Sequence, residues 1–205
     1  MTRDAERIVG LYERCAREWV GDRARPGKFF ERGWLDRFTA MIPAGDTILD
    51  LGCGPAKPMA AYLLAQGFDV CGVDSSPTMI SLARANFPDR EWIAADMRTL
   101  ALGKRFAGVM AWDSFFHLDF DDQRRMFPIF RDHAAPGAPL LFTSGPRHGE
   151  AIGDFRGEPL YHASLAPDEY RSLLAASEFD VVDFVPEDPS CGRHTVWLAR
   201  RTQDS

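Results

Sequence analysis

The stretch ILDLGCGPAKP, residues 48–58, decides the fold. Its apolar start and its loop with Gly52 and Gly54 predict a strand that turns into a helix. Glycine lets a ligand approach without a Cβ in the way, and the backbone amides and positive helix end lie beside it. The same two glycines could also serve only a tight turn. A dinucleotide-binding loop would have a third glycine where Lys57 stands.

Two acidic residues near this loop indicate the charge of a ligand. Asp50 lies just before the glycines, where it would repel a pyrophosphate but favour an ammonium or sulfonium group. Asp74 ends the next apolar run, where a carboxylate can accept hydrogen bonds from both hydroxyls of a ribose. Together they predict a positively charged nucleoside, although Asp74 could instead cap the helix that follows it.

Outward from this loop, apolar runs alternate with helical segments. The runs TILDLG, FDVCGVD, EWIAAD, AGVMAW and APLLFTS predict strands, and the segments between several of them have helical spacing. This alternation predicts a parallel sheet with helices on both faces. Gly67 and Gly137 are stop signals, and Pro128 is expected to kink or break its helix. After a helix opened by Pro167, two further runs predict a strand pair with an antiparallel last strand.

Segments at both ends of this core are candidate covers for a site. Residues 4–20 and 29–42 carry apolar stripes at helical spacing, the second with Phe30, Trp34, Leu35 and Phe38. They predict packing helices, and residues 4–30 could in addition close over the ligand as a lid. The segment at residues 146–166 is too long for a simple connection and predicts a functional cover. Its inward-facing residues stay open among Arg147, His148, Glu158, Tyr161 and His162.

Composition limits the function. The net charge of −6 and the pI near 5.4 argue against a protein that mainly binds RNA or DNA. The four cysteines lack disulfide or zinc spacing, and Asp113 with Asp119 is too little for a metal site, so no metal is expected. No apolar run reaches 18 residues and the N-terminus is charged, which predicts a soluble protein of the cytoplasm without a membrane partner.

In order and spacing, these segments resemble the class I S-adenosylmethionine-dependent methyltransferases. ILDLGCG resembles their first motif, VCGVDSSPTMISLAR the acidic second-strand motif, and WIAADMRTL the third-strand motif. FAGVMAWDSFFHL and PGAPLLFTS resemble the fourth- and fifth-strand segments. The match runs from about Trp34 to about Arg200, and Ala56 departs from it where many members have glycine.

The resemblance implies a single α/β domain over residues 1–205, a Rossmann-like doubly wound sheet of about seven strands. Its parts would be the N-terminal helices or lid (residues 1–40), the cofactor-binding core (41–145), the cover segment (146–166) and the C-terminal helix with its strand pair (167–205). It also implies S-adenosyl-L-methionine as the cofactor. The implied cofactor-binding residues are Asp50, Gly52, Cys53, Gly54, Asp74, Ser75, Met79, Asp96, Met97, Trp112 and Asp113.

Methyl transfer from a sulfonium depends on alignment and a dry pocket, so a base is optional. His117 and Asp113 are the catalytic candidates, although a histidine in such a place is more often a packed or helix-capping residue than a base. The candidate acceptor-binding residues are Tyr12, Trp34, Phe116, His117, Tyr161 and His162.

The acceptor is predicted by exclusion. Methyltransferases acting on amide or exocyclic base nitrogens have [DNS]PP[YFW] after the fourth strand, where this chain has WDSFF, and a Pro-Cys nucleophile is missing. These departures favour a small-molecule acceptor, with oxygen, nitrogen, sulfur and halide left open as the methylated atom. The alternatives are a non-catalytic binding protein for S-adenosylmethionine or S-adenosylhomocysteine and a nucleic-acid methyltransferase. The oligomeric state is not predicted.

Overall fold

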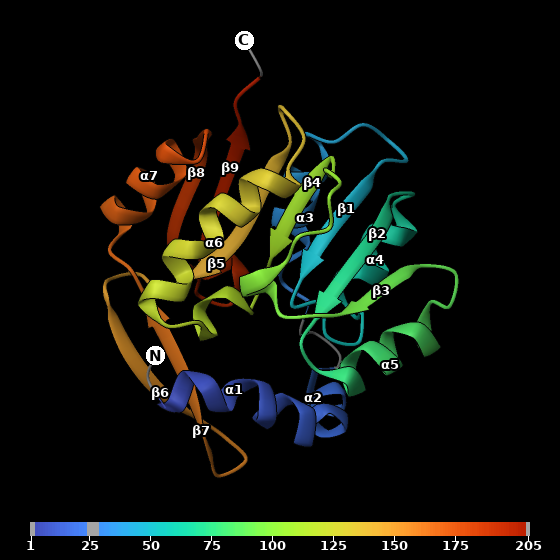
Figure 1. The fold of residues 1–205 in the computed structure, drawn as a ribbon, viewed down its shortest axis with the longest axis vertical. Helices are drawn as coiled ribbons and strands as arrows, with labels where there is room; N and C mark the ends of the chain where they lie inside the picture. Colours follow the sequence, from blue (N-terminus) through green and yellow to red (C-terminus); the bar gives the residue numbers. More distant parts are fainter. Residues whose placement is uncertain (1–2, 24–28, 204–205) are drawn as a thin grey trace.

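The computed structural model describes residues 3–23 and 29–203 and has a seven-stranded sheet at its centre (Figure 1). The strand order is β3-β2-β1-β4-β5-β9-β8, and β9 is antiparallel to both of its neighbours. The predicted α/β sheet of about seven strands with an antiparallel last strand is therefore confirmed. The strands are β1 (Thr47–Leu51), β2 (Asp69–Asp74), β3 (Glu91–Ala94), β4 (Gly108–Ala111), β5 (Pro139–Ser144), β8 (Phe179–Asp188) and β9 (His194–Arg201).

Helices cover both faces of the sheet because successive strand residues point to opposite sides. In β1, Leu49 packs in one core with α6 (Phe120–His133) and α7 (Pro167–Ala176). Its neighbour Ile48 packs in the other core with α3 (Arg32–Thr39), α4 (Met59–Ala65) and α5 (Pro77–Asn86). Three short 3₁₀ turns, η1 (Met97–Thr99), η2 (Phe115–His117) and η3 (Pro189–Cys191), complete the elements around the sheet.

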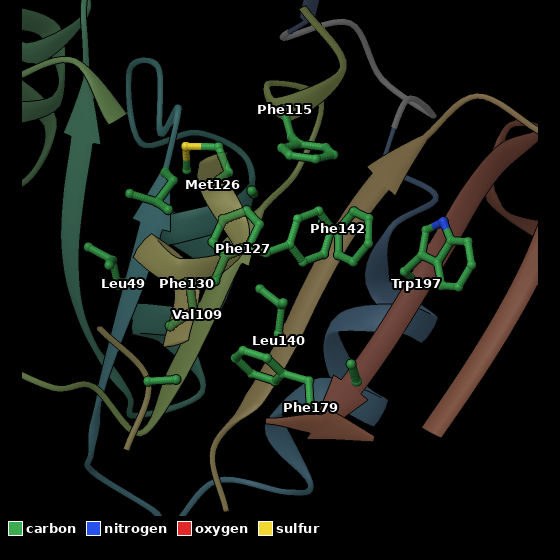
Figure 2. Close-up of a cluster of buried hydrophobic side chains, with 14 of the residues drawn as sticks. Leu49, Val109, Phe115, Met126, Phe127, Phe130, Leu140, Phe142, Phe179 and Trp197 are labelled. Atoms are coloured by element: carbon green, nitrogen blue, oxygen red, sulfur yellow. The ribbon is translucent and has the colours of Figure 1, made fainter. Parts of the chain in front are cut away.

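Aromatic rings dominate the core on the α6 side (Figure 2). The Phe142 ring on β5 stacks on the Trp197 ring on β9, with centroids 5.8 Å apart. Phe115 of η2 is fully buried and lies against Phe127, Phe130 and Phe142. This contact ties the loop after β4 to α6 and to the sheet.

Helix α6 is continuous through Pro128, so of the two expected outcomes, a kink or a break, the break does not occur. Proline removes one backbone donor, but Met126, Phe127 and Phe130 are fully buried on the sheet side of the helix. Asp119 caps the N-terminus by accepting a 2.8 Å hydrogen bond from the Asp122 amide. Core burial and capping together keep the helix continuous.

The N-terminal region forms two helices, α1 (Arg3–Arg14) and α2 (Ala16–Arg23), rather than the single predicted helix over residues 4–20. Hydrogen bonds from Cys15 N to Leu11 O and from Trp19 N to Cys15 O still span the junction, so it is a local interruption. α1 packs on a neighbouring β-hairpin, whereas Trp19 of α2 reaches the glycine loop. Residues 24–28 of the predicted lid lie outside the described residues.

The predicted cover over residues 146–166 is an antiparallel hairpin of β6 (Gly149–Phe155) and β7 (Glu158–Ser164). Ile8 and Leu11 of α1 pack against Tyr161 and Ala163 of β7. α1 lies across the ends of the parallel strands, with the hairpin beside it (Figure 1). Phe30, expected on the stripe of the next helix, precedes α3 and is 37% exposed. Within the described ranges, every helix is too short or too polar to cross a bilayer.

Candidate active site

A cavity lies at the carboxyl ends of β1, β2 and β4, the edge at which open α/β sheets bind ligands. Ile8, Val9 and Tyr12 of α1 and Trp19 of α2 line it from the N-terminal side. The structure brings all of the predicted cofactor-binding residues together around this cavity. They are Asp50, Gly52, Cys53, Gly54, Asp74, Ser75, Met79, Asp96, Met97, Trp112 and Asp113.

The carboxylate of Asp74 joins the two loops that form the floor of the cavity. Its Oδ2 accepts a 2.9 Å hydrogen bond from the Gly54 amide, and its Oδ1 accepts a 2.8 Å hydrogen bond from the Ser76 amide. The cap of α5 is Ser76, whose Oγ accepts from the Met79 amide at 3.1 Å. Asp74 is therefore not the capping residue, and each of its oxygens retains a second lone pair for a ligand.

Gly52 allows the close approach of the loop after β4. It has a φ of +78°, and a Cβ built on it would lie 2.2 Å from the Cβ of Ser114. Ser114 Oγ in turn donates a 2.7 Å hydrogen bond to Leu51 O, which holds the two loops together. A glycine is thus required at position 52 for both its backbone conformation and its contact.

Burial strongly affects the acids of this floor. Asp50 is 3% exposed, and burial together with the nearby charge of Asp74 raises the pKa of Asp50 to about 7. Burial also raises the pKa of Asp74, even though the Ser76 and Gly54 amides act in the opposite direction. A cationic ligand beside both carboxylates would stabilise their charged forms.

The adenine-side candidates form a separate charged group. Arg98 Nη2 pairs with Asp96 Oδ2 at 2.6 Å, and Arg98 Nη1 pairs with Asp122 Oδ2 at 3.0 Å. The ion pair with Arg98 lowers the pKa of Asp96. Asp96 also caps η1 by accepting from the Arg98 amide. The acid is therefore held in place at the cavity wall instead of being freely solvated.

On the opposite side, His117 connects three segments of the chain. Its Nδ1 lies 2.7 Å from the main-chain oxygen of Tyr161 on β7, and its Nε2 lies 2.9 Å from the hydroxyl of Tyr12 on α1. The imidazole is 6% exposed, and burial lowers the pKa of His117 to about 4. His117 is therefore neutral near pH 7.

A second histidine pairs with Asp113, another predicted site residue. His194 Nε2 at the start of β9 lies 2.9 Å from Asp113 Oδ1. Burial by itself lowers the pKa of His194, but the bond to Asp113 outweighs it and the pKa rises to about 11. Asp113 has a positive φ of 49°, so this pair holds a strained loop residue. The Asp113 amide donates to Thr143 Oγ1 at 3.0 Å.

The sequence comparisons agree with this geometry. Residues 48–137 match the family model described as "Methyltransferase domain". The trans-aconitate 2-methyltransferase of Azoarcus sp. (strain BH72) is 36% identical over 119 residues, covering 53% of this chain and 43% of that protein. The enzyme of that name from Escherichia coli O157:H7 is 45% identical over 56 residues, covering 26% and 21%. The chain thus spans less than half the length of these curated relatives.

Solved structures share the fold over most of the chain. The 1,6-didemethyltoxoflavin-N1-methyltransferase of Burkholderia thailandensis has a TM-score of 0.73 at 21% identity, covering 99% of this chain and 92% of that one. The sugar N-methyltransferase KedS8 of Streptoalloteichus sp ATCC 53650 has a TM-score of 0.74 at 17% identity, covering 91% and 93%. At such low sequence identities, the similarity shows a shared fold. Residues 48–137 therefore match the methyltransferase family model within a chain that shares the fold of these enzymes.

Two predicted acceptor-binding side chains do not line the cavity. Trp34 is 4% exposed in the core beneath α3, and its Nε1 donates to Asp188 Oδ2 at 2.7 Å. The Tyr161 side chain is 2% exposed, packs against Ile8 and Leu11, and donates to Glu150. Both expectations are corrected for the same reason, because packing in an apolar cluster turns these rings away from the cavity. The main-chain oxygen of Tyr161 contacts His117.

The remaining acceptor candidates cluster beside His117. The Phe116 and His162 rings lie 4.8 Å and 4.9 Å from the His117 ring, centroid to centroid. Phe116, His162 and His194 also line a neighbouring depression between the hairpin and the turn from β8 to β9. His117 and Asp113, in contrast, line the first cavity.

Two residues of this site were not predicted from the sequence. Glu13 of α1 accepts hydrogen bonds from Ser76 Oγ and Thr78 Oγ1, each at 2.5 Å, and from the Thr78 amide at 3.1 Å. His194 pairs with Asp113 from a strand 81 positions later in the chain. Glu13 sits among many charges on its helix, so no local pattern distinguishes it. For His194, the sequence offers one signal, which is its position at the start of the predicted last strand.

We expect Gly52→Ala to destabilise the methyltransferase domain more than Gly67→Ala does. Both glycines have positive φ, +78° and +88°, but only a Cβ at position 52 meets other atoms, those of Ser114 and Met97. Strain alone costs about 1–2 kcal/mol, and overpacking adds about 1–3 kcal/mol. Urea unfolding of the two variants measures the difference, and equal losses would contradict a close contact at Gly52.

The stability of the ligand-free domain is expected to fall as the pH rises from 6 to 8. The pKa of Asp50 is raised to about 7, so its contribution is full below the unfolded value of about 4 and is lost as the pH passes 7. The loss of about 1 kcal/mol corresponds to a melting temperature about 3 °C lower. Asp50→Asn should reduce this slope, whereas Asp180→Asn at an exposed site should leave it unchanged. An identical slope in Asp50→Asn would contradict a neutralised Asp50.

Proposed function

We propose that the chain is an S-adenosyl-L-methionine-dependent methyltransferase that acts on a small-molecule acceptor. The observation that carries this proposal is the Asp74 carboxylate, held by the Gly54 and Ser76 amides beside a glycine loop in the cavity. That arrangement suits a ligand with both a ribose and a cationic amino-acid tail. The match of residues 48–137 to the methyltransferase family model and the similarity to named methyltransferases support the same activity.

The residues present fit this cofactor. Asp74 would accept hydrogen bonds from the ribose hydroxyls, and Asp50 would face the ammonium group of the tail. Gly52 lines the cavity where the tail is expected, and its lack of a Cβ lets Ser114, which also lines the cavity, lie close to the glycine loop. Within the residues that the structure describes, the buried Trp112 Nε1 has no hydrogen-bond acceptor, so a ligand carboxylate would satisfy a donor on the cavity wall.

The adenine end has its own group of candidates. Ser75, Met79, Asp96 and Met97 line the cavity beyond Asp74, from the loop after β2 and the loop after β3. The Met79 side chain is 3% exposed and offers an apolar surface for a base. The Asp96 carboxylate is fixed by Arg98 and can accept a hydrogen bond from an exocyclic amine.

When bound, the cofactor supplies an electrophilic methyl group on a positively charged sulfur. The protein's part is to align the acceptor and to exclude water, because charge is lost from the sulfonium during transfer. α1 and α2 line the cavity with Ile8, Val9 and Trp19, apolar residues that suit this task. His117 and Asp113 are the residues on the wall at which an acceptor would meet the methyl group.

Several features favour a small acceptor over a nucleic acid. The net charge is −6, and the N-terminal helices line the cavity in which the transfer would take place. The methyltransferases similar to this chain are named for trans-aconitate, for 1,6-didemethyltoxoflavin and for a sugar. An acceptor of comparable size would enter beside His117 and His162.

Calorimetry with S-adenosylmethionine and S-adenosylhomocysteine tests the first half of the proposal, with binding of both expected. The second half is tested with methyl-labelled cofactor and a panel of alcohols, phenols, amines, thiols, carboxylates and halides. Transfer to one class is expected. Binding without transfer to the panel or to any component of a cell extract would favour a non-catalytic binding protein. A salt-sensitive gel shift with labelled RNA or DNA would favour a nucleic-acid enzyme.

A further inference from the structure

The contacts of His117 fix which of its nitrogens carries the proton. The main-chain oxygen of Tyr161 can only accept, so His117 Nδ1, 2.7 Å away, must be the donor. In the neutral ring, Nε2 then holds the lone pair, and the Tyr12 hydroxyl at 2.9 Å must donate to it. The hairpin thus sets the tautomer that leaves His117 able to take a proton on the side of the cavity.

The hydroxyl that bonds this lone pair belongs to a residue that itself lines the cavity. Tyr12 and His117 both line the cavity, and their rings meet edge to face with centroids 5.4 Å apart. Burial, together with the charges of Asp113 and Asp74, raises the pKa of Tyr12, so the phenol keeps its proton at neutral pH. Tyr12 can therefore receive a proton from an acceptor only if its own proton moves to His117 Nε2.

We propose that Tyr12 and His117 act as a catalytic dyad that removes the acceptor's proton, and that the N-terminal helix therefore completes the active site instead of only covering it. This inference rests on the proposed function. As the acceptor atom gains the methyl group, its proton goes to Tyr12 Oη, and the phenolic proton of Tyr12 goes to His117 Nε2. The positive charge lost from sulfur then appears on the imidazolium. The acceptor class is accordingly one that must lose a proton: a hydroxyl or a neutral amine.

Glu13, the next residue along, positions Tyr12. Its carboxylate binds Ser76 Oγ, Thr78 Oγ1 and the Thr78 amide at the start of α5. These hydrogen bonds lower the pKa of Glu13. Ser76 and Thr78 lie within four residues of Asp74, so the segment expected to hold the nucleoside also anchors the helix that carries Tyr12. On its other side, α1 is held by Ile8 and Leu11 against the hairpin that fixes His117.

Tyr12→Phe tests the dyad, with an acceptor found in the panel of the proposed function. We expect kcat to fall about 10²–10³-fold, the contribution typical of a positioned base, with the Kd of S-adenosylhomocysteine changed less than threefold. His117→Asn should give a similar loss, and the double variant little more, because the two residues act as one unit. Tyr62→Phe, which removes an exposed hydroxyl on α4, is the matched control and should leave kcat unchanged. An unaffected kcat in Tyr12→Phe, or a loss matched by weaker binding of S-adenosylhomocysteine, would overturn the proposal.

Two further measurements, the pH profile of kcat and the effect of a Glu13 variant on it, distinguish a catalytic role of these residues from a purely structural one. Titratable groups near His117 are Tyr12 from α1, His162 from β7 and Asp113 from the loop after β4. Because burial keeps the pKa of His117 near 4, kcat of the wild type should be flat from pH 6 to 8 and fall only toward pH 4. Glu13→Gln should lower kcat about tenfold without changing that profile, whereas Glu18→Gln on α2 should have no effect. A shifted profile in Glu13→Gln would contradict its positioning role.

Nuclear magnetic resonance tests which nitrogen of His117 carries the proton, and it needs no acceptor. Long-range ¹H–¹⁵N spectra at pH 7, recorded with S-adenosylhomocysteine added, should show His117 as the neutral Nδ1–H tautomer. The Nε2–H tautomer, or an imidazolium, would overturn the dyad. This measurement needs neither methyl transfer nor a known substrate. A failure of the proposed function is detected by a different experiment, as the absence of binding heat in calorimetry.

Discussion

Replacing Asp74 with alanine is expected to weaken binding of S-adenosylmethionine and S-adenosylhomocysteine at least 100-fold. The variant loses the carboxylate that would accept from both ribose hydroxyls, and hydrogen bonds to a charged group contribute about 1.5–3 kcal/mol each. It also releases the Gly54 and Ser76 amides, which bind the two carboxylate oxygens. The glycine loop thereby loses its link to the start of α5, so the affinity falls for a second reason.

Asp69→Ala is the matched control because Asp69 begins the strand that Asp74 ends. Asp69 accepts from the Val70 amide and pairs with Arg90 at 3.3 Å, so it too is a bonded acid. It lies at the opposite end of β2 from the cavity, and its loss should change the Kd less than threefold. Calorimetry on both variants measures the contrast. Unchanged binding in Asp74→Ala would remove the basis of the proposed function.

The parts of this fold that the sequence predicts are those governed by local periodicity. Short apolar runs recur between residues 47 and 144 with helical segments between several of them, and each strand of the parallel core follows from this pattern. Asp50 and Asp74 were predicted together because both stand at strand ends, and the carboxyl ends of parallel strands meet at one edge.

The contacts on the acceptor side depend instead on long-range packing. The pairs Tyr12–His117 and His194–Asp113 join residues 105 and 81 positions apart, and no local pattern sets such distances. The Trp34 and Tyr161 side chains illustrate the same limit. An aromatic residue suits a ligand site and an apolar core equally well, and only the packing of α3 and of the hairpin decides between them.

Phe115→Ala is expected to cost about 3–5 kcal/mol of unfolding free energy, which lowers the melting temperature by roughly 10 °C. Phe115 is fully buried, and its ring lies within 5.3 to 6.1 Å of Phe142, Phe130, Phe127 and Tyr170, centroid to centroid. Its removal leaves a cavity among rings from α6, α7 and β5. These elements are held apart by the sheet and cannot collapse fully into the space.

The same substitution should impair the site, because Phe115 and His117 occupy one turn of η2. Without the Phe115 anchor, η2 can rotate, and the bonds from His117 to Tyr12 and to Tyr161 O would no longer be held at their present lengths. Phe30→Ala is the chemically matched control, since Phe30 is 37% exposed, and it should cost less than about 1 kcal/mol. Urea unfolding compares the two variants. A similar small loss in both would mean that the loop after β4 is positioned by something other than its aromatic anchor.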